Sequence, residues 1–159
     1  MKGAVVASVT RSIEIAGSAD AVWKVLEDVR LLPQMSHSTT HVEAPERLSA
    51  VGDTFEQTVK LAGKSFTSKW TVRDIDPGTR LVISGSVLPG TKYTMTEEIE
   101  SLDSSRTRLS LIMDYSLPFG PVGRLAAKLG AERRANSEAT TVLEGVRRLV
   151  EQRSETRAS

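Results

Sequence analysis

Stretches of alternating apolar and polar residues follow one another between positions 40 and 117, and this repetition constrains the fold more than any other feature of the chain. Alternation with a period of two is typical of strands that bury one face. Such strands are predicted at residues 40–47, 53–61, 65–75, 80–88, 92–101 and 106–117. Short turn sequences rich in Gly, Pro, Asp and Ser separate them, so neighbouring strands must be antiparallel, because a parallel pair needs a long crossover.

The remaining elements lie at the two ends of the chain. Residues 5–15 alternate as well and add a first strand, and residues 19–30 have apolar residues at helical spacing after Ser18, which can cap a helix. Pro33 favours a break and then a short second helix within residues 31–38. A long helical pattern runs from about 121 to 152, and the polar residues 153–159 are expected to be a disordered tail.

This order of elements predicts an α+β fold in one domain over residues 1–152. Each predicted strand has one apolar and one polar face, so the sheet should pack on one side only. The long C-terminal helix is large enough to cover that side. We therefore expect a seven-stranded curved antiparallel sheet that wraps around this helix, with two short helices after the first strand.

Composition excludes several classes of site. The chain has no cysteine, which excludes disulfides, thiolate nucleophiles and metal sites with Cys ligands. Its formal net charge of +1 does not favour a nucleic-acid partner or an anionic membrane. No stretch approaches the ~20 apolar residues of a membrane helix, and we expect a cytoplasmic protein without stable membrane insertion.

Four segments together resemble the helix-grip superfamily of START-like (SRPBCC) lipid-transfer domains, polyketide cyclases and birch-type pollen allergens. Residues 19–28 (ADAVWKVLED) are similar to its first helix, and residues 51–55 and 70–72 to its third and fourth strands. Residues 32–35 (LPQM) lie where the family usually has an aromatic-Pro-acidic-Trp turn. The resemblance covers residues 9–152 and implies a cavity between sheet and helix, but no single reaction, because members of the superfamily bind, transport, cyclise or sense.

The inward face of the strands supplies the candidate ligand-binding residues. Aromatic, Met and polar side chains on this face could surround and orient a ligand. The candidates are Phe55, Gln57, Phe66, Trp70, Ile83, Tyr93, Met95, Glu97, Met113 and Tyr115, together with Leu125 and Leu129 on the long helix.

Among the charged residues, Glu97 is the strongest candidate for a functional role, because alternation places it between Met95 and Ile99 on the apolar face. A desolvated carboxyl has a raised pKa, as a general acid or base requires. Two alternatives remain open: an ion pair with Arg11, or a bulge that turns the side chain outward. Tyr93, Tyr115 and His37 are the other candidates for acid-base chemistry.

The sequence predicts no metal site and no cofactor. His37 and His41 are four residues apart, but their segment resembles a loop, and we interpret them as surface histidines. Phosphate-binding glycine loops are absent. The basic residues of the last helix alternate with Glu132, Glu138, Glu144 and Glu151, which predicts a solvated face.

Three functions compete. The first is binding of a small hydrophobic or amphipathic ligand (a lipid, a polyketide or an aromatic molecule), and we expect segments 33–40, 88–92 and 119–125 to surround the opening of its cavity. The second is a cyclase or dehydratase that uses the acid-base candidates. The third is a toxin-like component with an antitoxin partner, because residues 117–123 resemble a segment of bacterial toxins in this superfamily. A homodimer also remains open.

Overall fold

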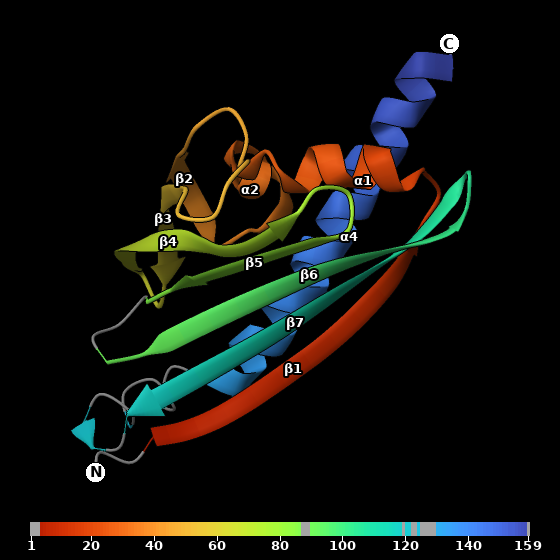
Figure 1. Ribbon diagram of the computed structural model, residues 1–159. Coiled ribbons are helices and arrows are strands. Elements are labelled where there is room, and N and C mark those ends of the chain that lie inside the picture. Colours follow the sequence, from red (N-terminus) through yellow and green to blue (C-terminus); the bar gives the residue numbers. More distant parts are fainter. Residues whose placement is uncertain (1–3, 87–89, 119, 122–123, 125–129, 159) are drawn as a thin grey trace.

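The computed structural model describes residues 4–86, 90–118, 120–121, 124 and 130–158, and its dominant feature is a curved sheet with a long helix across one face (Figure 1). The sheet has seven strands in the order β1-β7-β6-β5-β4-β3-β2, each antiparallel to its neighbours. The strands are β1 (Ala4–Ile15), β2 (Thr39–Glu43), β3 (Thr54–Leu61), β4 (Lys64–Asp76), β5 (Arg80–Gly85), β6 (Lys92–Asp103) and β7 (Arg106–Pro118). The predicted helix-grip architecture is confirmed.

Two short helices and a 3-10 turn follow β1. Helix α1 (Ala19–Leu26) begins at Ser18, whose hydroxyl accepts a hydrogen bond from the backbone N–H of Ala21 at 3.2 Å. The sequence predicts that this helix extends to residue 30. It ends at Leu26 instead, because Asp28 caps a separate 3-10 turn, η1 (Val29–Leu31). The carboxylate of Asp28 accepts from the backbone N–H of Arg30. Helix α2 (Leu32–Met35) follows directly.

The long helix α4 (Ala131–Ala158) crosses the concave face of the sheet, and its C-terminal end projects beyond the sheet (Figure 1). It begins later than the predicted residue 121. Pro121 and Arg124 are also helical, but Gly130, which precedes α4, has a φ of +75°, which an α-helix cannot contain. The helix also continues past Gln152 to Ala158 and so extends into the residues predicted to form a disordered tail, a prediction that remains to be tested. Glu and Arg in this tail are good helix formers, and no Gly or Pro stops the helix there.

The end of β2 also differs from the sequence prediction. Strand β2 ends at Glu43 rather than at residue 47, and Pro45 follows. Proline has no backbone N–H to donate to a neighbouring strand, so the ladder stops before it.

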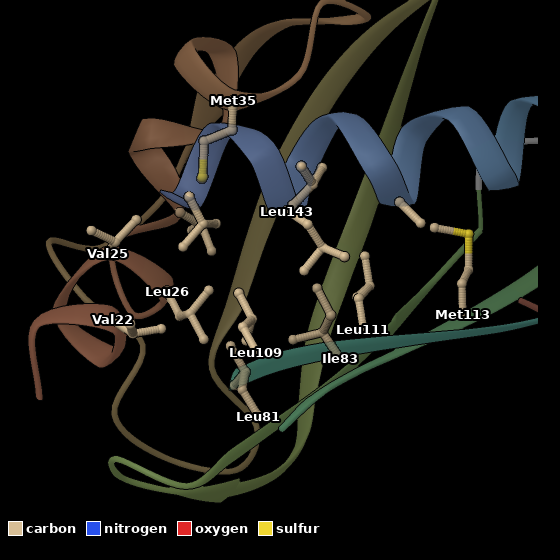
Figure 2. Packing of buried hydrophobic residues seen from close by; sticks show 14 of the residues in the cluster. Val22, Val25, Leu26, Met35, Leu81, Ile83, Leu109, Leu111, Met113 and Leu143 are labelled. Atoms are coloured by element: carbon tan, nitrogen blue, oxygen red, sulfur yellow. The ribbon is translucent and has the colours of Figure 1, made fainter. Parts of the chain in front are cut away.

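The core lies between the concave face of the sheet, α1 and α4. Figure 2 shows Leu81, Leu109 and Leu111 of the sheet converging with side chains of α1 and with Leu143 of α4, and these three leucines are at most 1% exposed. Two glycines allow close approaches at the edges of this core. A Cβ on Gly145 of α4 would lie 2.6 Å from the Cα of Met35 in α2. Gly85 leaves room for the indole ring of Trp70, because a Cβ there would lie 2.7 Å from Trp70 Cδ2.

Candidate functional site

A cavity of about 180 Å³ lies between the sheet and α4. Leu26, Met35, Ala135, Val142 and Val146 line it on the helical side. On the sheet side, it is lined by eight of the candidate ligand-binding residues: Phe55, Gln57, Trp70, Ile83, Tyr93, Met95, Glu97 and Met113. Most of the lining is apolar, so the few polar groups stand out.

Three of the sequence candidates do not line this cavity. Tyr115 is buried and stacks against Tyr93, with ring centroids 6.0 Å apart. Phe66 is half-buried near the β3–β4 turn, paired with Val59. His37 is exposed. Leu125 and Leu129 lie outside the described residues, as do residues 119, 122, 123 and 125 of the predicted opening segment 119–125 and residues 119, 122 and 123 of the toxin-like segment 117–123.

Glu97 lies in the apolar wall of the cavity. Its neighbours on the adjacent strands are Leu81 and Leu111, which are almost completely buried. The residue as a whole is half-buried, but its Oε2 atom is shielded from water and has no hydrogen-bond partner within the described part of the chain. Burial raises the pKa of the Glu97 carboxyl to about 7. At neutral pH this group is therefore divided between its protonated and ionised forms.

Neither alternative considered for Glu97 is found. Arg11 is exposed and lies in the same cross-strand row, but Leu111 stands between the two residues. The Arg11 guanidinium donates to Asn136 of α4 and to the carbonyl of Thr10 instead. The irregularity in β6 lies near its end, between Ser101 and Asp103. The register around Glu97 is regular, so its side chain stays inward.

Tyr93 also faces the cavity, four residues before Glu97 on β6. Burial raises the pKa of its phenol, and the neighbouring Tyr115 adds a smaller effect in the same direction. Four residues of strand span ~13 Å, so Tyr93 and Glu97 lie at different levels of the cavity. They do not form a hydrogen-bonded acid-base pair.

A polar cluster that sequence reasoning missed lies at another part of the cavity wall. Glu138 of α4 accepts hydrogen bonds from the hydroxyls of Ser36 and Ser38, the latter at 3.1 Å. Ser38, Glu138 and the nearby Arg134 line the cavity. The prediction of a solvated Glu138 is wrong, because the segment after α2 folds over this part of α4. The helical spacing of apolar residues in the sequence does not show which positions of the helix another segment of the chain covers.

The segment from Gln34 to Ser38 is fixed to α4 along its length. Arg148 donates to the carbonyl of Gln34, Met35 packs on Gly145, and the two serines bond Glu138. Met35 and Ser36 are buried. This segment belongs to the predicted opening region, yet it is closely packed.

A second hollow of about 560 Å³ lies near the start of α1 and the β6–β7 turn. Its basic residues Lys24, Arg106 and Arg153 are exposed. Lys24 pairs with Asp20, and Arg106 pairs with Asp103. We regard it as a solvated surface depression, although it is the larger of the two.

Metal ligands do not gather in the ranges that the structure describes, where no group of three or more His, Asp or Glu residues is suited to a metal ion. Of the described helices, none has the length and apolar character needed to cross a membrane.

Several solved structures share this fold. The Zhui aromatase/cyclase from a Streptomyces species is 21% identical, covers 94% of this chain and 96% of its own, and has a TM-score of 0.80. A START superfamily protein from Mycobacterium smegmatis is 19% identical, over 89% of this chain and 98% of its own, with a TM-score of 0.65. Norcoclaurine synthase from Thalictrum flavum, in complex with dopamine and hydroxybenzaldehyde, is 16% identical, over 94% and 88% of the two chains, with a TM-score of 0.68.

At the level of sequence, no curated protein matches the chain. Residues 6–151 match the family described as polyketide cyclase/dehydrase and lipid transport. This match spans β1 to most of α4 and includes every described residue that lines the cavity. The chain therefore belongs to the polyketide cyclase/dehydrase and lipid transport family.

Proposed function

We propose that the protein binds a small, largely apolar molecule in the cavity between the sheet and α4. The observation that carries the proposal is the cavity itself, with apolar walls and a few polar groups such as Glu97, Tyr93 and Gln57. Burial of apolar ligand surface yields ~25 cal/mol per Å². The polar groups would then fix the orientation of the ligand.

The cavity volume favours a compact ligand over an extended lipid chain. An engineered protein cavity of about 150 Å³ stays dry and binds benzene. The cavity here, at about 180 Å³, would hold one aromatic ring with a small substituent. Norcoclaurine synthase, which shares the fold, is described in complex with two single-ring molecules, dopamine and hydroxybenzaldehyde. This similarity supports the size class and not the identity of the ligand.

The two tryptophans of the chain provide the test. Trp70 lines the cavity, whereas Trp23 is buried in α1 and is not part of the lining. We expect single-ring aromatic compounds to shift the indole N–H resonance of Trp70 saturably in ¹H–¹⁵N spectra and to leave that of Trp23 in place. The Trp23→Phe variant assigns the two signals.

A cavity-filling variant supplies the control. Ala135 is buried and lines the cavity, so Ala135→Leu should occupy part of the space and weaken binding while the fold is kept. Binding that persists unchanged in this variant, or a Trp70 signal unmoved by any aromatic compound, would contradict the proposal.

A second function, acid-base catalysis on the bound molecule, has one observation in its favour. The pKa of Glu97, raised to about 7, suits proton transfer at neutral pH. Tyr93 lies at another level of the cavity and gives Glu97 no direct partner. If catalysis occurs, Glu97→Gln should abolish turnover of a bound compound and leave its affinity nearly unchanged, as measured by single-turnover kinetics and by titration.

A further inference from the structure

Glu97 is not explained by the packing of the fold. A buried polar group without a partner destabilises a protein, because it loses its hydrogen bonds to water and gains none in return. A hydrophobic side chain between Leu81 and Leu111 would avoid that loss. The Oε2 atom of Glu97 lacks a partner in the described chain, and the side chain lines the cavity. The position of this atom indicates that its partner is the ligand.

The charged groups around the cavity are already engaged with other residues. Glu138 accepts from Ser36 and Ser38, and Arg11 donates to Asn136. Arg134, the remaining cationic residue in the described lining, also interacts with other protein groups. On the elements that contact β6, the lining residues are apolar: Leu26 on α1, Leu81 and Ile83 on β5, and Met113 on β7. Helix α4 lies across the cavity and contributes Val142 and Val146 as well as Arg134 and Glu138.

These surroundings discriminate between the chemical groups that could meet Glu97. An ammonium group has three N–H donors, and at Glu97 it would find one carboxylate among aliphatic side chains. Its remaining donors would be desolvated without compensation, at a cost that can exceed the gain from the ion pair. A carbonyl or ether oxygen needs a single donor and brings no charge. The protonated carboxyl of Glu97 supplies that one donor.

We propose that Glu97, in its protonated form, donates a hydrogen bond to an uncharged oxygen acceptor on the ligand, and that the ligand is a single-ring aromatic ketone, aldehyde or ether. This inference rests on the proposed binding function. The ring would lie among Ile83, Met95 and Met113, which are the next residues of the wall beside Glu97.

Shape-matched probes test the proposal. Acetophenone and ethylbenzene differ mainly by a carbonyl oxygen, and benzylamine presents an ammonium group in a similar position. We expect acetophenone to bind about tenfold more tightly than ethylbenzene at pH 6, as one well-made hydrogen bond implies. Affinities are measured by titration calorimetry.

Two substitutions at Glu97 separate hydrogen bonding from shape. Glu97→Leu removes the donor and should make acetophenone and ethylbenzene bind equally. Glu97→Gln keeps an N–H donor and should retain the preference for acetophenone. Glu98→Gln, on the exposed opposite face of β6, is the matched control and should change neither affinity. Circular dichroism and the melting temperature show that each variant is folded.

The dependence on pH provides a second readout. Because only protonated Glu97 donates, and its hydrogen bond is expected to be worth about tenfold in affinity, acetophenone should bind about fivefold more weakly at pH 8 than at pH 6, given a pKa of about 7. Glu97→Gln should remove this difference. Calorimetry in buffers of different ionisation enthalpy should show that wild type takes up protons when it binds acetophenone at pH 7.

The outcomes distinguish this inference from the function on which it rests. If none of the three probes binds, the binding function itself fails. If acetophenone and ethylbenzene bind wild type equally and independently of pH, binding stands and the role of Glu97 is refuted. Tighter binding of benzylamine, with proton release, would also refute it and would assign the site to cations.

Discussion

At the scale of single residues, the carboxyl group of Glu97 makes the stability of the protein depend on pH. Its pKa is about 7 in the folded chain and about 4.5 when the group is exposed to water. Between these values the folded state holds more protons than the unfolded state. Stability therefore falls as pH rises through this window and levels off above it. The difference between the two pKa values corresponds to roughly 3 kcal/mol.

Glu97→Gln should remove this dependence. Relative to wild type, we expect the variant to gain roughly 3 kcal/mol in free energy of unfolding between pH 4.5 and pH 7.5, because an amide does not have to ionise in the apolar wall. Urea denaturation at several pH values measures the difference. A constant difference between the two proteins over this range would mean that Glu97 reaches water in the folded state.

The sequence predicted the direction of Glu97 but not its partners. The period of two in a strand determines which face a side chain takes, and β6 is regular at this point. Whether Arg11 reaches Glu97 depends on the side-chain conformation of Arg11 and on the position of Asn136 in α4. Long-range contacts of this kind leave no local pattern. The same reason explains why the bonds from Ser36 and Ser38 to Glu138 were not predicted.

At the scale of elements, the contact between α2 and α4 depends on a glycine in α4, which has no side chain. Gly145 is buried in α4, and an added Cβ would lie 2.6 Å from Met35 Cα and 3.0 Å from its carbonyl oxygen. Both of these atoms belong to the backbone of α2. They cannot move aside as the end of a flexible side chain could.

Gly145→Ala should lower the free energy of unfolding by roughly 2 kcal/mol through this overlap. Alanine is otherwise favoured over glycine in a helix by about 1 kcal/mol, so the local preference predicts the opposite sign. Ser137→Ala, at an exposed position of the same helix, is the control and should be neutral or slightly stabilising. Chemical denaturation of both variants measures the effect, and a stabilised Gly145→Ala protein would show that α2 moves away freely.

Strands were predicted more accurately than helix ends. Alternation and short turns located all seven strands, because both signals are local. The ends of the helices depend on single residues that are compatible with more than one local structure. Asp28 could continue α1 or cap a new turn. Gly130 could lie within a helix or interrupt it. In the structure, Asp28 caps η1 and Gly130 adopts a positive φ.

At the scale of the whole molecule, the prediction of a single domain remains to be tested, and the two tryptophans report on different parts of it. Trp23 lies in α1 and Trp70 lies in β4. We expect Trp23→Phe and Trp70→Phe proteins, each with one fluorophore, to show a single urea transition that coincides with the loss of circular dichroism in the same variant. Two separate transitions in either variant would indicate parts that unfold independently.

The resemblance to a family led us to expect the cavity, whereas the pattern of residues alone could not predict it. Inward-facing side chains look alike whether they fill a core or surround an empty volume. Leu109 and Phe55 both face inward, yet only Phe55 lines the cavity. The difference depends on how far α4 stands from each part of the sheet, which three-dimensional packing determines.

The attachment of residues 34–38 to α4 affects how often this part of the cavity wall can open. Its contacts involve Glu138, Gly145 and Arg148, and ten residues of helix span ~15 Å. This part of the cavity wall can separate from the helix only if these contacts break together, which is a rarer event than the motion of a free loop. If a ligand has to pass this wall, its residence time is set by how often the wall opens, and even a weakly held molecule would leave slowly.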